Sequence, residues 1–165
     1  MKPWSWPFRA AVRTLRGIRP GWARPDDAWA EARLDAPERS LYRAMDPRDR
    51  AHAVEVACAL VRAFPGAPGE VVRAALLHDV GKSRRAYRLG ERIAAHLVRV
   101  APPPPEPALH GWAGARQVAA HHGAYGAAMI RAAGGSWRVA ELVARHDRPG
   151  SDRWAAILRE IDRRT

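Results

Sequence analysis

The stretch Leu76-Leu77-His78-Asp79-Val80-Gly81-Lys82 lies in the middle of the 165-residue sequence. In it, an apolar run is followed by an adjacent imidazole and carboxylate, His78 and Asp79. A glycine and a cation, Gly81 and Lys82, come shortly after them. Such a pair needs partners if it is buried, because unpaired polar and charged groups are costly inside a protein. A divalent metal ion is the simplest partner that satisfies both groups. The stretch therefore predicts a metal site, provided that other helices supply further ligands.

The remaining sequence predicts an all-α fold, namely a helical bundle without strands. Ala and Arg dominate, β-branched residues other than Val are scarce, and no segment alternates as a strand would. Asp46-Pro47, Ser136 and Asp152 are typical helix starts. Pro and Gly interrupt the pattern at 65–66, 102–107, 134–135 and 149–150. Helices are therefore expected over 25–34, 37–44, 46–64, 68–81, 86–100, 114–133, 136–146 and 152–165.

Length and composition predict one domain, residues 25–165, behind a short basic and aromatic extension, residues 1–24. The single cysteine, Cys58, excludes an internal disulfide and fits a reducing, cytoplasmic location. No signal peptide or transmembrane segment is expected, because no apolar run approaches about 20 residues. The tryptophans and arginines of the extension are compatible with packing on the domain itself, on a membrane surface or on a partner, including a second copy in a homodimer.

The formal net charge of +11 favours anionic partners such as nucleotides, nucleic acid or acidic lipid. The arginines, however, are spread along almost every predicted helix. A solvated, arginine-rich surface explains that distribution as well as a nucleic-acid interface does. Nucleic acid therefore stays open as a partner on charge alone.

Five predicted helices each place a His or Asp on an otherwise apolar stripe, because residues three or four apart share a helix face. The residues concerned are His52, His78 with Asp79, His122, His146 and Asp162. One histidine on such a face is usually a satisfied core residue. Five inward-facing polar positions favour convergence on a single site instead, since unpaired buried groups would cost about 1–3 kcal/mol each. Nitrogen and oxygen ligands without thiolate suit Fe, Mn, Ni, Zn or Mg.

The order His52, His78-Asp79, His122, His146 and Asp162 resembles the HD superfamily of metal-dependent phosphohydrolases over about residues 45–165. The segments that carry the resemblance are Asp49 to Ala57, Leu76 to Lys82, His122 to Ala127, Val143 to His146 and Ile161-Asp162. Many binuclear members have two adjacent histidines where this chain has His146-Asp147, so Asp147 is either a ligand or merely polar. Arg48, not a glutamate, lies one turn before His52 and argues against a third metal. No Gly-Tyr-Pro follows, so the cyclic-di-GMP branch is not indicated.

The resemblance implies one or two divalent metal ions. Metal one would be held by His52, His78, Asp79 and Asp162, and metal two by His122 and His146 with Asp79 bridging. Asp79 and Lys82 are the expected catalytic residues, Lys82 as a phosphate contact. The implied reaction is hydrolysis, by metal-activated water, of a phosphoester or phosphoanhydride in a small phosphorylated substrate, a nucleotide. The alternatives are a catalytically weak metal-binding or nucleotide-binding regulatory module and a nuclease of the same superfamily.

Several neighbouring residues are left outside this ligand set. Ser83, Arg84 and Arg85 either bind a second phosphate or form a solvated basic loop. His121 points about 100° away from His122 around the helix. His110 lies in the proline-rich loop, at the surface or at the substrate mouth, and His96 has no assigned role. Trp112 and Tyr125 could stack on a base or simply pack.

Overall fold

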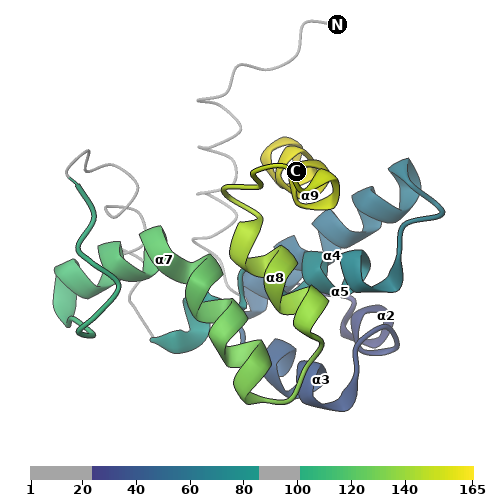
Figure 1. Ribbon diagram of the computed structural model, residues 1–165. Helices are drawn as coiled ribbons and strands as arrows, with labels where there is room; N and C mark the ends of the chain where they lie inside the picture. The colour runs from purple at the N-terminus through teal and green to yellow at the C-terminus, as the bar shows by residue number, and fades with distance from the viewer. Residues whose placement is uncertain (1–23, 86–100) are drawn as a thin grey trace, which may run out of the picture.

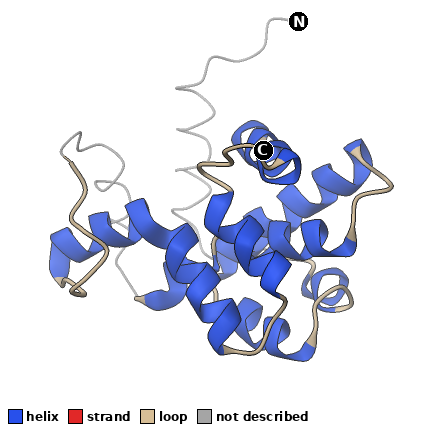
Figure 2. Ribbon diagram, in the orientation of Figure 1, coloured by secondary structure: helices blue, strands red, loops and turns tan. Residues whose placement is uncertain are grey.

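A computed structural model describes residues 24–85 and 101–165 (Figure 1). Within these residues the protein is all-α, as predicted, and has no strand (Figure 2). The elements are α2 (Asp27–Glu31), α3 (Ala36–Arg43), α4 (Pro47–Ala63), α5 (Gly69–Leu77), the 3₁₀ helix η2 (Val80–Arg84), α7 (Gly111–Ala132), α8 (Trp137–Arg145) and α9 (Arg153–Arg164). The predicted helix 86–100, with His96, and the extension lie outside the described residues. The division of the chain at residue 24 stays a prediction.

Helices α4, α8 and α9 begin at the predicted capping residues, whereas α7 begins at Gly111, three residues before the predicted start. Asp46 accepts a hydrogen bond from the backbone N–H of Arg48 at the start of α4, and Pro47 follows it. Ser136 caps α8, and the Asp152 carboxylate accepts two N–H groups at the start of α9. Side-chain acceptors at these positions satisfy N–H groups that a helix leaves unpaired, so each start is fixed locally.

Helix α5 forms the centre of the domain. Its residues Val71, Val72 and Ala74 to Leu77 are buried, so this helix has an apolar surface on nearly every side. Helices α4 and α8 pack against it, and α9 lies across α4 and α8 near the top of the view (Figure 1). This arrangement brings the ends of α5 and α8, the middle of α7 and the inner faces of α4 and α9 toward one region.

The predicted helix 68–81 ends earlier than expected. α5 stops at Leu77, His78 caps it, and the chain continues from Val80 as η2. The reason is a close backbone approach, because a Cβ atom on Gly81 would lie 1.9 Å from the carbonyl oxygen of His122 in α7. Only glycine allows η2 to lie so near α7. The stretch Leu76 to Lys82 therefore covers the end of α5, a turn and the start of η2, and η2 lies close to α7.

None of the helices in the described part of the chain is both long enough and apolar enough to cross a bilayer.

Candidate metal centre

The structure brings all six predicted metal ligands together. They form two groups whose donor atoms lie within 4.8 Å of one another, and the groups are His52, His78 and Asp162, and Asp79, His122 and His146. The rings of His78 and His146 lie 5.4 Å apart between centroids and connect the two groups. Six residues spread over 110 positions thus converge on one place, as the sequence pattern predicts. The part each residue plays in holding an ion stays a proposal.

The first group joins α4, the end of α5 and α9. The Nε2 atom of His52 lies 2.8 Å from Oδ1 of Asp162, and the Nε2 atom of His78 lies 3.5 Å from the same oxygen. His78 is buried, whereas the side chains of His52 and Asp162 are 19% and 23% exposed. The first group is therefore open to solvent on the side of α4 and α9.

The second group joins α7 and α8 to the turn after α5. The Nε2 atoms of His122 and His146 lie 3.1 Å apart, and Oδ1 of Asp79 lies 3.5 Å from Nε2 of His122. All three residues are buried. Gly123 permits the approach of α8, because a Cβ atom there would lie 3.3 Å from the His146 ring.

Three histidines are oriented by the same backbone contact. The Nδ1 atoms of His78, His122 and His146 lie 2.8–2.9 Å from the carbonyl oxygens of Ala75, Ala119 and Val143, three residues earlier in each case. A carbonyl only accepts, so each Nδ1 carries the proton and donates it. The Nε2 atom of each neutral ring then presents a lone pair to the centre, which is the arrangement found in histidine ligands of metals.

The two groups fit divalent ions. Ligands about 2.1 Å from an ion are separated by about 3.0 Å at right angles and about 3.4 Å in a tetrahedron, and the distances above lie close to this range. The Nε2 atom of His78 is buried without a hydrogen-bond partner. The Nε2 lone pairs of His122 and His146 face one another, which is unfavourable unless a cation lies between them. Nitrogen and carboxylate donors without sulfur suit Fe, Mn, Ni, Zn or Mg.

Asp79 has one oxygen toward each group. Its Oδ2 lies 3.6 Å from Nε2 of His78, while Oδ1 faces His122. The Lys82 ammonium donates a 2.6 Å hydrogen bond to Oδ2 from the first turn of η2. The Asp79 carboxylate therefore faces both groups, and Lys82 lies at the edge of the centre.

The two groups differ in their affinity for protons. Burial alone would lower the pKa of His78, but the charge of Asp79 and the contact with Asp162 outweigh it and raise this pKa to about 9. Burial, with Lys82 and His146 nearby, lowers the pKa of His122 to about 4 despite the Asp79 charge. Burial also lowers the pKa of His146. Burial opposes ionisation of Asp79, yet Lys82 and His78 hold its pKa well below the ordinary value.

A family model of the HD domain matches residues 50–165, which is more than half of the chain. The protein belongs to the HD-domain family. Membership indicates a metal-dependent phosphohydrolase in general terms, and the converged His and Asp groups agree with it. Neither a search of curated proteins nor a search of solved structures found a match to this HD domain.

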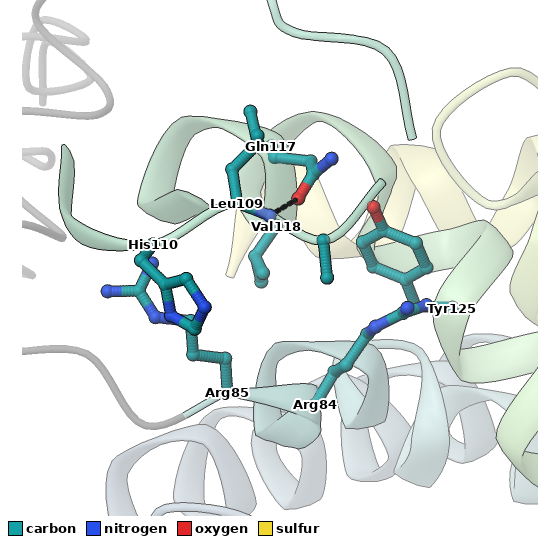
Figure 3. Close-up of a pocket in the computed structure, with 8 residues that line it drawn as sticks. Arg84, Arg85, Leu109, His110, Gln117, Val118 and Tyr125 are labelled. Atoms are coloured by element: carbon teal, nitrogen blue, oxygen red, sulfur yellow. Dashed lines mark hydrogen bonds between the residues drawn. The ribbon is translucent and has the colours of Figure 1, made fainter. Parts of the chain in front are cut away.

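The HD domain has a pocket between η2, α7 and the loop that precedes α7 (Figure 3). Arg84 lies over the Tyr125 ring at 4.1 Å and forms a 2.8 Å ion pair with Glu106. Arg85 and His110 line another side of the pocket, and Arg85 donates to the carbonyl of Gly111. His110 and Tyr125 thus border this cavity, whereas Trp112 is 39% exposed.

Gln117 holds the proline-rich loop against α7, a role that the sequence did not reveal. It is buried, donates to the carbonyls of Pro104 and Pro107, and accepts from the backbone N–H of Leu109. The hydroxyl of Tyr125 donates to the carbonyl of Pro105. His121 also contacts this loop, through the carbonyl of Pro103, and stays out of both ligand groups, as expected from its direction. The available signal in the sequence was the position of Gln117, on the helix face next to the one that carries His122.

Proposed function

We propose that this chain hydrolyses a phosphoester or phosphoanhydride of a small phosphorylated substrate at a centre of two divalent ions. His52, His78, Asp79 and Asp162 would hold the first ion, and His122 and His146 the second, with Asp79 bridging. The observation that carries the proposal is the Asp79 carboxylate, whose two oxygens face two separate groups of histidines. Pairs of closely spaced metal ions are typical of phosphatases and nucleases, in which the two ions stabilise the attacking and the leaving oxygens.

Divalent ions bound there would supply activated water and take up charge on the phosphoryl oxygens. The chain's own contribution is orientation. The carbonyl contacts fix the imidazole rings, and η2 places the partly exposed Lys82 ammonium beside Asp79, where it can contact a phosphate oxygen. Asp79 and Lys82 are accordingly the residues proposed to act directly in catalysis.

We propose a nucleotide as the substrate, because the pocket is lined by Arg84 and Arg85, which closely follow Lys82 along the chain and offer contacts beyond the scissile phosphate. Arg84 and Arg85 can bind further phosphate groups, and Tyr125 provides an aromatic wall. Ser83 is committed to the carbonyl of Val80 and adds little to phosphate binding. Nucleic-acid binding, a homodimer and a cytoplasmic location stay predictions from composition.

The test is hydrolysis by the full chain, freed of metal and reloaded with Mn²⁺, Fe²⁺, Ni²⁺, Zn²⁺ or Mg²⁺, against a panel of phosphomonoesters and nucleotides. Asp79→Asn and Asp162→Asn should each lower kcat/KM by at least about 100-fold, since each removes a charged ligand. Glu160→Gln, an exposed carboxylate on the same helix as Asp162, is the matched control and should keep activity. Activity without metal, or full activity in Asp79→Asn, would refute the proposed function.

A further inference from the structure

The first residue after the helix α8 cap, Asp147, also approaches the second group of histidines. We infer that Asp147 is a further protein ligand of the second ion, which would then be bound by two imidazoles and two carboxylates. The inference rests on the proposed function, because it requires that a second ion binds at His122 and His146. It assigns a chemical preference to that position, namely a hard divalent cation such as Mn²⁺ or Mg²⁺.

The distances from Asp147 to His122 and His146 support an ion shared by the three side chains, and not a direct contact between them. Oδ2 of Asp147 lies 3.5 Å from Nε2 of His122 and 3.5 Å from Nε2 of His146, which are themselves 3.1 Å apart. A separation of 3.5 Å is too long for a good hydrogen bond. It is close to the separation of two ligands of one ion, which is about 3.0 Å at right angles and about 3.4 Å in a tetrahedron. One carboxylate oxygen equidistant from two lone pairs marks the third corner of a coordination sphere.

The local backbone also favours a cation here. His146 is the C-cap of α8, so Asp147 lies just beyond the end of a helix, where its carbonyl groups concentrate partial negative charge. A carboxylate at that place is unfavourable without a nearby cation. The turn is fixed by a 3.0 Å hydrogen bond from the Arg148 N–H to the Arg145 carbonyl. Asp147 is thereby held beside His146 by the chain itself.

With Asp147, the two ions have similar donors. The first would be bound by His52, His78, Asp162 and Asp79, and the second by His122, His146, Asp147 and Asp79. Carboxylate oxygen in place of a third imidazole shifts the preference from Zn²⁺ toward Mn²⁺ and Mg²⁺. The Asp147 side chain is 57% exposed, so the second group is open to solvent on this side.

The experiment measures Mn²⁺ binding to the metal-free full chain by calorimetry, with the bound stoichiometry checked by electron paramagnetic resonance. The wild-type chain should bind two Mn²⁺ ions. Asp147→Asn should weaken the second ion by at least about 10-fold and leave the first within about twofold, because second-group contacts alone are altered. Asp147→Ala should do the same, and Glu141→Gln, which removes a carboxylate from α8 that pairs with Arg138 and Arg145, should bind as wild type.

Two results would overturn the inference, and they are distinguishable. Two ions bound with unchanged affinities in Asp147→Asn and Asp147→Ala would show that Asp147 is a solvated surface carboxylate, and the proposed hydrolase would stand. A wild-type chain that binds only one Mn²⁺ would remove the binuclear function and the role of Asp147 together. Thermal unfolding of the metal-free variants at the wild-type temperature verifies that a weakened second ion reflects a lost ligand.

Discussion

The two halves of the centre are built differently. The group of His52, His78 and Asp162 comes from α4, α5 and α9 and joins residues 110 positions apart through a direct His52–Asp162 contact. The group of His122 and His146 comes from α7 and α8, which are consecutive helices separated only by residues 133–136. The first half therefore forms only when the whole domain has folded, whereas the second half is local in sequence.

The halves also differ in how they behave without metal. The first has its own counter-charges, and the raised pKa of His78 means that a proton binds among the carboxylates. The second contains two histidines with lowered pKa values and facing lone pairs. The first half can be stabilised by a proton, but the second depends on an ion. Asp79 and Gly81 connect them, and this connection is the place where a small change should have the largest effect.

Gly81→Ala should disrupt both halves and produce the largest loss. The new methyl group would collide with the His122 carbonyl and the Gly126 nitrogen, which are backbone atoms that cannot turn aside. Overpacking of this kind costs about 1–3 kcal/mol and occasionally more, and because the clash is with backbone, the free energy of unfolding should fall by about 3 kcal/mol, as measured by chemical denaturation. Gly69→Ala, on α5 where a Cβ meets nothing within 4 Å, is the control. Equal stability of the two variants would contradict the close approach described here.

The sequence predicted the all-α fold and all six converging residues because both depend on helix periodicity. A His or Asp on an apolar stripe must point inward wherever the helix packs. His52 with Val56 and Leu60, and His146 with Val139 and Leu142, needed no knowledge of their neighbours. The resemblance to the HD superfamily added the order of the residues. The family match over residues 50–165 confirms the resemblance.

Features that depend on distances between helices could not be predicted in this way. The end of α5 at Leu77 follows from the backbone approach of Gly81 to α7, and nothing in the local sequence encodes how near α7 lies. Gln117 binds carbonyls of a loop whose path is set by tertiary contacts. Asp147 was left open, since its distance from His122 is set by the packing of α8 on α7.

Metal binding should stabilise the protein more at high pH, and His78 should be the reason. Its pKa of about 9 in the folded protein exceeds the ordinary value near 6.5. The stabilisation is complete below pH 6.5 and is lost as the pH rises through 9, so the melting temperature of the metal-free chain should fall over that range. A bound ion needs His78 neutral, and the rise in melting temperature on adding Mn²⁺ should therefore increase from pH 6.5 to 9.

Variants in each half separate this effect from general titration. The metal-free His78→Gln protein should lose the decline between pH 6.5 and 9. His122→Gln should keep the decline, because the pKa of His122, about 4, places its folded-state titration below this range. Identical pH profiles for the two variants, from differential scanning fluorimetry in metal-free buffers, would show that the halves do not differ in proton affinity.

The smallest expected effect concerns the pocket between η2, α7 and the proline-rich loop. Arg84 is paired with Glu106 and lies over Tyr125, so an anionic substrate group must compete with the Glu106 carboxylate for Arg84. If the pocket binds phosphates beyond the scissile one, Glu106→Gln should lower KM for a nucleoside triphosphate about threefold, and Arg84→Ala should raise it by about 3–10-fold, within the range of an exposed charged contact. The informative quantity is the ratio of this KM to that for a simple phosphomonoester, with Arg164→Ala, an exposed arginine on α9, as control. Opposite shifts of the ratio in the two variants would assign the pocket to the distal part of the substrate, whereas parallel shifts for both substrates would mean that Arg84 and Glu106 only anchor the proline-rich loop.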